Sequence, residues 1–160
     1  MTQKQHHTIP PFCDQSSQIL ILGSFPSVKS RETGFYYGHP QNRFWKVLAN
    51  VFHDPLPLSV DEKKQFLSKH NIALWDVIQQ CEIEGSSDSS IKNAVYNDIA
   101  YLISQTDIKR IFTNGKLAHN LYTTHLLKQT GIEAENLPST SPANASYSVD
   151  KLTSFWKVIL

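Results

Sequence analysis

The sequence predicts an α/β fold, in which residues 1–160 form a single three-layer domain with a central, mostly parallel four-stranded sheet flanked by helices. Two observations carry this prediction. Four short apolar runs of strand length recur along the chain, and segments with helical spacing of apolar residues separate them. Strands that alternate with helices form a parallel sheet covered on both faces. A chain of 160 residues with 40% hydrophobic residues can also bury its own core.

The first half of the chain supplies two of the strands. Residues 1–16 are predicted to form an irregular N-terminal lead that contains Pro10-Pro11. The first strand follows at 18–22, because a continuous apolar run is typical of a buried parallel strand. A long loop then leads to a helix that begins near Asn42 and has apolar residues at helical spacing up to Val51. The next predicted elements are a helix with a capping box at 59–70 and a strand at 72–75.

In the second half of the chain, helices and strands again alternate after a polar loop at 85–90. A helix is predicted at 91–103, and the third strand at 108–113 passes through Asn114-Gly115 into the helix at 116–128. The fourth strand is predicted at 132–137. The last helix places four apolar residues on one face: Leu152, Phe155, Trp156 and Ile159.

Composition narrows the classes of function. The formal net charge of +1 is not that of a strongly basic nucleic-acid-binding domain. The chain has no apolar run of membrane-spanning length, and its polar start, residues 1–7, lacks the apolar segment of a secretory signal. Cytoplasmic residence is therefore expected. Cys13 and Cys81 are too few for an iron–sulfur cluster or a four-thiolate zinc site, and His6-His7 is interpreted as a solvated terminus.

Two irregular polar loops follow the first and the fourth predicted strands. In open α/β sheets, ligands bind in the crevice beyond the carboxyl ends of the strands, so both loops are expected to face one crevice. The first loop, 23–42, is rich in aromatic side chains suited to stacking on a flat heterocycle. Basic side chains in or beside it form either a phosphate-binding patch or an ordinary solvated rim: Lys29, Arg31, Arg43 and Lys46.

Three segments resemble the motifs of a known family. They are Gly23-Ser24-Phe25-Pro26-Ser27, the block Tyr36 to Trp45, and the late run Leu137 to Ala145. Together they resemble the two motifs of the uracil-DNA glycosylase superfamily, most of all its hypoxanthine-DNA (deoxyinosine) glycosylase branch. The block Gly34 to Val47 is also similar to the mismatch-specific uracil glycosylases. The resemblance implies the fold predicted above, a DNA substrate that contains deaminated bases, and no metal or organic cofactor. It also implies a monomer that acts at the nucleoid.

The chain departs from the superfamily at two motif positions. Most members have Asp or Asn at the position of Phe25, where that residue orients the attacking water, and often His or Asn at the position of Ser139. In the hypoxanthine branch, the resemblance implies that Asn42 takes over this role. Asn is not a titratable base, but its carbonyl can position a water molecule near C1′ of the sugar. Its position alone favours a different role for Asn42, that of capping the helix that follows, whereas the resemblance favours the catalytic role; the two roles are compatible.

The resemblance also implies a base pocket and a DNA-contacting set. Asp76, at the end of the second strand, would accept a hydrogen bond from N1–H of hypoxanthine, although an Asp there could simply cap a turn. Asp88 and Ser87 are weaker candidates. The predicted base pocket consists of Gly23, Ser24, Phe25, Tyr36, Tyr37 and Asp76, with Tyr37 as the stacking aromatic. The predicted DNA contacts are Ser27, His39, Arg43, Ser139, Thr140, Ser141 and Asn144.

These features predict a monofunctional DNA glycosylase of base excision repair that hydrolyses the N-glycosidic bond of a flipped deaminated base, hypoxanthine above all. No lysine in either motif is placed as a Schiff-base nucleophile. Three alternatives stay open: a uracil or mismatch-specific DNA glycosylase, a non-catalytic protein that binds damaged nucleic acid, and a hydrolase of free nucleosides.

Overall fold

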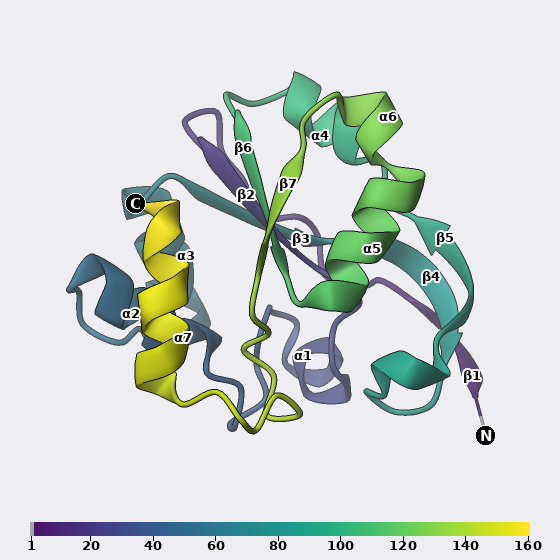
Figure 1. Cartoon of the computed structure of the whole chain (residues 1–160), viewed down its shortest axis with the longest axis horizontal. Coiled ribbons are helices and arrows are strands. Elements are labelled where there is room, and N and C mark those ends of the chain that lie inside the picture. Colours follow the sequence, from purple (N-terminus) through teal and green to yellow (C-terminus); the bar gives the residue numbers. More distant parts are fainter. Residues whose placement is uncertain (1) are drawn as a thin grey trace.

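A computed structural model describes residues 2–160 and contains the predicted parallel sheet. Its strands lie side by side in the order β3-β2-β6-β7, and every neighbouring pair is parallel (Figure 1). The chain first passes from β2 to β3 on one side and then returns to β6 on the other, so the topological switch point lies between β2 and β6. The bounds are β2 Ile19–Gly23, β3 Ile72–Asp76, β6 Arg110–Asn114 and β7 Ala134–Leu137.

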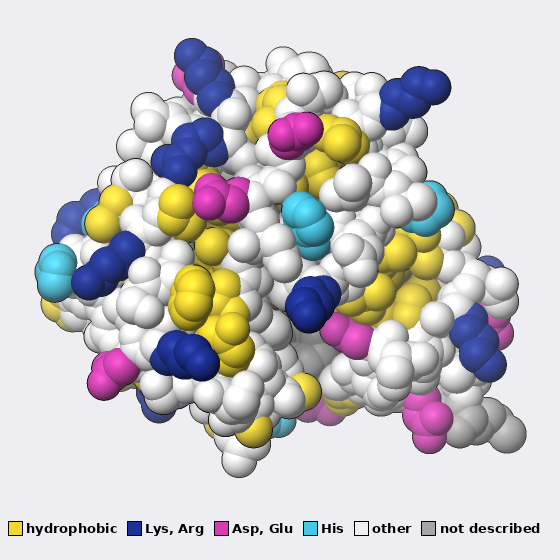
Figure 2. Space-filling view, in the orientation of Figure 1, with side chains coloured by type: hydrophobic (Ala, Val, Ile, Leu, Met, Phe, Trp, Pro, Cys, Tyr) yellow, Lys and Arg dark blue, Asp and Glu magenta, His cyan; other side chains and the backbone are white. Residues whose placement is uncertain are grey.

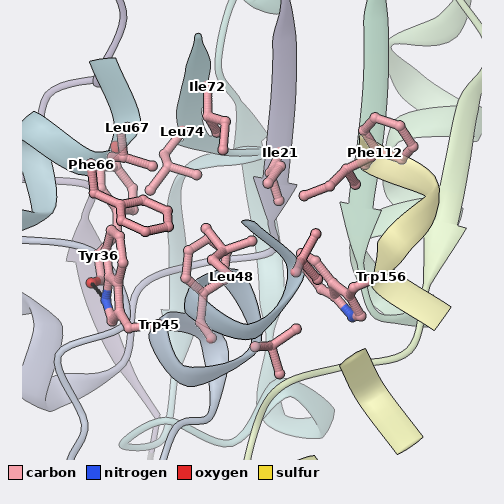
Figure 3. Close-up of a cluster of buried hydrophobic side chains, with 14 of the residues drawn as sticks. Ile21, Tyr36, Trp45, Leu48, Phe66, Leu67, Ile72, Leu74, Phe112 and Trp156 are labelled. Carbon is pink, nitrogen blue, oxygen red and sulfur yellow. Dashed lines mark hydrogen bonds between the residues drawn. The ribbon is translucent and has the colours of Figure 1, made fainter. Parts of the chain in front are cut away.

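Helices cover both faces of this sheet, as predicted. On one face, Ile21 and Phe112 of the sheet pack against Leu48 and Trp156 in a core that is rich in aromatic rings (Figure 3). On the other face, Leu20 and Leu22 belong to a second apolar cluster. The helices of the first face are α2 Phe44–Phe52, α3 Val60–Lys69 and α7 Val149–Trp156, which continues into the short 3₁₀ turn η2 Lys157–Ile159. Those of the second are α4 Ile99–Ser104, α5 Lys116–His125 and α6 Leu127–Thr130.

The continuous apolar run of β2 explains why it is central. All five of its residues are buried, because helices cover both of its sides. The register places Gly23, the last residue of β2, beside Asp76, the last residue of β3. Asn114 and Leu137 end β6 and β7 at the same edge in the same way. All four strands therefore deliver their carboxyl ends to one side of the sheet.

A second, antiparallel sheet was not predicted. Its order is β1-β4-β5, formed by Gln3–His6, Ile78–Ile83 and Lys92–Tyr96. Two predictions are therefore wrong: the lead 1–16 is not irregular at 3–6, and 91–103 is not one helix, because its first half is β5. These strands are mostly polar, and the β4–β5 pairing is interrupted by register shifts, so neither a continuous apolar run nor a regular alternation marks them. Met1 lies outside the described residues.

The loop between β2 and α2 contains a short helix of its own. Helix α1, Val28–Thr33, begins at Ser27, whose hydroxyl accepts from the Ser30 N–H, and ends at Gly34 with φ +79°. A 3₁₀ turn, η1 Asp88–Ser90, lies between β4 and β5. Figure 2 shows Lys and Arg side chains interspersed with Asp and Glu over the face in view. No helix within residues 2–160 has both the length and the apolar character needed to cross a bilayer.

Candidate active site

A cavity of about 530 Å³ lies beyond the carboxyl ends of the four parallel strands. Each strand contributes a wall residue at or just after its end: Gly23, Asp76, Asn114 and Ser139. The loop after β2 and the loop after β7 meet across this cavity, which lies at the strand ends where the sheet has its switch point. The predicted site residues that line it are Gly23, Ser24, Phe25, Ser27, Tyr36, Tyr37, His39, Asn42, Asp76, Ser139, Thr140 and Ser141. The structure leaves Arg43 and Asn144 outside the lining.

Asn42 lies on the cavity wall and is held by its carbonyl oxygen. Oδ1 accepts from the backbone N–H of Phe44 at 3.0 Å and from the hydroxyl of Thr140 at 2.9 Å. The first bond caps the start of α2, so the capping role considered from the sequence is present in the structure. Because both lone-pair directions of Oδ1 are in use, a water molecule can reach this oxygen only as a third donor or in place of Thr140. Asn42 is thus a rigid polar group at the cavity wall and cannot act as a base.

Thr140 and Asn114 form the support behind Asn42. The amide of Asn114 donates to Thr140 Oγ1 at 3.0 Å, and its carbonyl accepts from the Thr140 N–H at 3.0 Å. Thr140 is fully buried, so its hydroxyl is fixed between Asn114 and Asn42. These hydrogen bonds connect the ends of β6 and β7 to the start of α2. Asn114 was not predicted as a site residue, although its place at the carboxyl end of a strand is the signal that could have identified it.

Arg43 holds the second loop and does not face the cavity. Its guanidinium donates to the carbonyl oxygens of Thr140 at 3.3 Å, Ser141 at 2.7 Å and Asn144 at 3.0 Å, and also to that of Tyr147. The structure therefore gives Arg43 a different task from the predicted DNA contact, because these loop carbonyls already occupy its donors.

Other polar side chains of the predicted DNA-contacting set also hold the loops. The Asn144 amide donates to the Ser139 carbonyl at 3.0 Å, and Ser27 caps α1. His39 Nδ1 accepts from the Gln41 N–H at 3.1 Å, a bond that holds the loop. The predicted basic rim is also partly engaged within the protein. Arg31 donates to the Gly85 carbonyl at 3.1 Å, and Lys29 lies 3.8 Å from Glu32.

The two adjacent tyrosines have different surroundings. The Tyr36 hydroxyl donates to the Pro10 carbonyl at 2.9 Å, and the residue is only 1% exposed, so its ring belongs to the core and not to a free stacking surface. Tyr37 is half-buried with φ +55°, an uncommon conformation for a residue with a side chain. Its ring stacks on Phe44 with 4.0 Å between centroids. Of the two, Tyr37 is therefore the ring that can offer a flat surface to the cavity.

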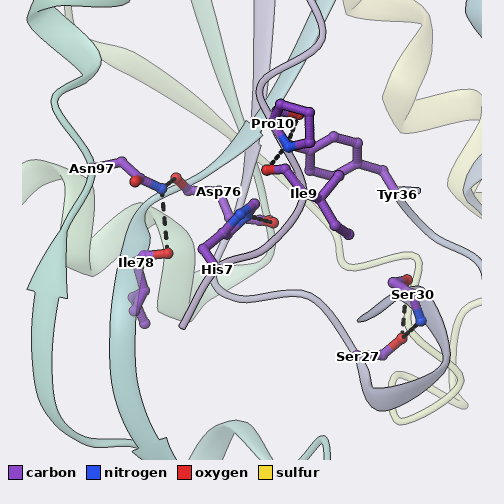
Figure 4. Close-up of polar contacts among 9 residues, drawn as sticks. All are labelled: His7, Ile9, Pro10, Ser27, Ser30, Tyr36, Asp76, Ile78 and Asn97. Atoms are coloured by element: carbon purple, nitrogen blue, oxygen red, sulfur yellow. Dashed lines mark hydrogen bonds and ion pairs between the residues drawn. The ribbon is translucent and has the colours of Figure 1, made fainter. Parts of the chain in front are cut away.

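The cavity floor contains a buried carboxylate. Asp76 Oδ2 lies 2.8 Å from Nε2 of His7, and the side chains are 4% and 2% exposed (Figure 4). The interpretation of His6-His7 as a solvated terminus is wrong for His7, because β1 pairs with β4 and carries it inward. Nothing in the polar sequence around His7 indicates this contact. Within residues 2–160, the nearby Tyr37 hydroxyl is buried without a hydrogen-bond partner, and burial raises its pKa well above the ordinary range.

A second carboxylate reaches the cavity from the polar loop at 85–90. Asp88 Oδ1 accepts from the Ser24 hydroxyl at 3.2 Å. Burial raises the pKa of the Asp88 carboxyl, and the negative charge of Asp76 adds to this effect. Phe25 lies between these two acids and the small sheet, in contact with Ile78 and Cys81. It supplies an apolar surface at the position where most superfamily members are expected to have a polar side chain.

Gly23 is required for the floor to have this shape. A Cβ at this position would collide with Asp76 Oδ1 and would lie 3.2 Å from the Tyr37 hydroxyl. Substitution of Gly23 by Ala is expected to displace the carboxylate and to destabilise the fold by about 1–3 kcal/mol, as overpacking does. Urea denaturation measures this penalty. In an Asp76→Ala background the penalty should largely vanish, whereas an undiminished penalty there would show that the collision is not its cause.

Comparisons with known proteins agree with this architecture. A family profile described as Uracil DNA glycosylase superfamily matches residues 10–159. A Methanosarcina acetivorans protein named hypoxanthine DNA glycosylase is 37% identical over 152 residues, 94% of each chain. A protein of the same name from Methanosarcina barkeri is 34% identical over 137 residues, which cover 84% of this chain and 85% of the relative.

The fold is shared with a solved structure as well. The NMR structure of a Methanosarcina acetivorans protein, described as a candidate uracil DNA glycosylase, has a TM-score of 0.79 and 32% sequence identity, covering 94% of this chain and 96% of its own. The family profile spans nearly the whole chain, and both named relatives exceed 30% identity over most of their length. The chain therefore belongs to the uracil DNA glycosylase superfamily.

Proposed function

We propose that this protein is a monofunctional DNA glycosylase that removes a deaminated base, hypoxanthine above all, from DNA. One observation carries the proposal: both motif loops converge on a single cavity at the carboxyl ends of the parallel strands, with Asn42 on its wall and Asp76 at its floor. The relatives named hypoxanthine DNA glycosylase, which match over most of their length, support the choice of base.

The cavity suits a base extruded from the duplex. Enzymes that act on a base take it out of the stack and hold it between flat or apolar side chains. Tyr37 would provide one surface, and its stacking on Phe44 keeps that ring in place. Phe25 would provide apolar contact near the floor. Asp76, as an acceptor, would meet the N1–H of hypoxanthine.

Hydrolysis would then break the bond between C1′ and N9. The electron pair of this bond leaves with the base, while the oxygen of a water molecule bonds to C1′ and its proton passes to solvent or to the departing base. Positive charge develops on the sugar before the water adds. The reaction therefore needs a correctly placed water molecule and does not need a strong base. Asn42 is suited to this placement because Thr140 and the start of α2 fix its amide. In the described part of the chain no lysine lines the cavity, which favours simple hydrolysis over a covalent Schiff base.

A set of duplexes tests the proposal. Each contains one deoxyinosine, deoxyuridine or deoxyxanthosine, with an undamaged duplex as control, and abasic sites are measured by alkaline cleavage. The deoxyinosine duplex is expected to be cleaved fastest. Release of uracil without hypoxanthine would favour the second candidate, a uracil glycosylase, which the described solved relative supports. Tight binding without base release would show a non-catalytic protein, and equal action on free inosine would show a nucleoside hydrolase.

A further inference from the structure

The N-terminal lead contributes a side chain to the cavity floor from behind. His7 directly follows β1, and its imidazole packs between the rings of Phe25 and Tyr36, with centroid distances of 6.0 and 6.1 Å. It does not line the cavity, and its polar contact within the floor is the 2.8 Å bond from Nε2 to Asp76 Oδ2. Because an ionised carboxylate can only accept, the imidazole Nε2–H is the donor.

The two oxygens of Asp76 are therefore not equivalent. Oδ2 is engaged by His7, whereas Oδ1 lies next to Gly23 on the cavity side and makes no hydrogen bond within residues 2–160. The backbone of Asp76 is fixed as well, because the Asn97 amide donates to its carbonyl at 2.8 Å (Figure 4). A carboxylate this deeply buried needs a partner to offset its lost hydration, and His7 supplies that partner.

We propose that His7 is a positioning residue that makes Asp76 selective for deaminated bases; this inference rests on the proposed glycosylase function. Deamination of adenine replaces the lone pair at ring position N1 by an N–H. A carboxylate oxygen fixed in place accepts from that N–H but repels the lone pair that adenine carries at the same ring position. Without His7, the Asp76 side chain is free to rotate and to draw water into the floor, so that this discrimination weakens.

His7 also reduces the electrostatic repulsion between Asp76 and the departing base. Negative charge builds up on the base as it departs, and an unpaired carboxylate at the floor would oppose this step. The hydrogen bond from His7 withdraws charge from Asp76 and lets the acceptor remain close to the leaving base. His7 is therefore expected to affect the rate of bond cleavage more than the binding of the DNA duplex.

The test compares three variants with the wild-type protein. His7→Leu removes the donor, His7→Gln keeps an N–H donor, and His6→Leu is the matched control, since His6 is the neighbouring exposed histidine. Single-turnover release of hypoxanthine is measured together with binding of free hypoxanthine and free adenine. His7→Leu is expected to lose about tenfold in rate and about tenfold in preference for hypoxanthine over adenine, the effect of losing one good hydrogen bond. His7→Gln should recover most of both, and His6→Leu should match the wild type.

A measurement on the wild-type protein keeps the proposal testable if His7→Leu does not fold. The NMR signal of the imidazole Nε2 of His7 should shift when hypoxanthine is added and should stay in place with adenine. Equal behaviour of the Leu and Gln variants, unchanged selectivity in both, or an unresponsive imidazole signal would each overturn the role of His7. If the wild type binds hypoxanthine in preference to adenine and the His7 signal shifts, but no base is released from DNA, the proposed catalysis fails while the role of His7 in base selection stands. If it neither binds nor releases the base, both fail.

Discussion

Substitution of Asn42 by Ala is expected to slow release of hypoxanthine from deoxyinosine DNA by about 100- to 1,000-fold, the range seen when one positioned polar group is removed from an active site. The amide that would place the attacking water is lost, and the Thr140 hydroxyl loses its acceptor. Single-turnover formation of abasic sites gives the rate directly. The start of α2 also loses a cap, so the free energy of unfolding should fall by about 1 kcal/mol.

A serine at position 42 separates the two roles of this residue. Asn42→Ser keeps a side-chain oxygen for the Phe44 N–H, so its stability should stay within a few tenths of a kcal/mol of the wild type, roughly as among good capping residues. Its rate of base release should remain as low as that of Asn42→Ala. If either variant were stable and released hypoxanthine within about threefold of the wild-type rate, Asn42 would be a cap and the water would be held elsewhere.

The second large effect is expected at Arg43. Arg43→Ala removes the fork of donors that holds the carbonyls of Thr140, Ser141 and Asn144, residues about a hundred positions away in sequence. Hydrogen bonds from a charged donor contribute more than neutral ones, and the abandoned carbonyls are partly buried. The free energy of unfolding should therefore fall by about 2–4 kcal/mol. Urea denaturation measures this loss. Activity should fall too, because Thr140 supports Asn42.

Two further substitutions show whether the fork itself is responsible. Arg43→Lys retains the charge but not the planar set of donors, and it should recover less than half of the lost stability. Arg110→Ala is the matched control, because this exposed arginine also donates to backbone carbonyls, those of Val158 and Leu160. Its effect should be within about 0.5 kcal/mol, as for most surface substitutions. If Arg43→Ala and Arg110→Ala reduced the free energy of unfolding equally, the hydrogen bonds of Arg43 to the loop after β7 would not explain the loss.

The central sheet could be predicted because burial on both faces leaves a plain mark in the sequence. Strand β2 is the clearest case, with every residue apolar or Gly and every residue buried. The segment 91–103 shows the limit of such patterns. Ile91, Val95 and Ile99 recur every four residues and predict a helix. In the structure, 92–96 pairs with β4, because a tertiary contact outweighs local spacing.

The candidate site could likewise be predicted only in part. The cavity walls could be predicted because motif residues follow strand ends, where the chain topology brings them together. The hydrogen bonds that individual polar side chains make could not be predicted. Arg43 and Asn144 have the donors that a phosphate contact needs, but the carbonyls of the second loop need the same donors. His7 escaped prediction because its position depends on pairing between residues about 75 positions apart, which leaves no periodic signal around it.

The pairing of β1 with β4 has a practical consequence for anyone who handles this protein. The first strand begins at Gln3, so an affinity tag fused to the amino end would start within a few residues of His7. Trimming that end, a routine step before crystallisation, would remove an edge strand and leave Asp76 without its imidazole. The carboxyl end lies on the opposite flank in Figure 1, and a purification handle belongs there.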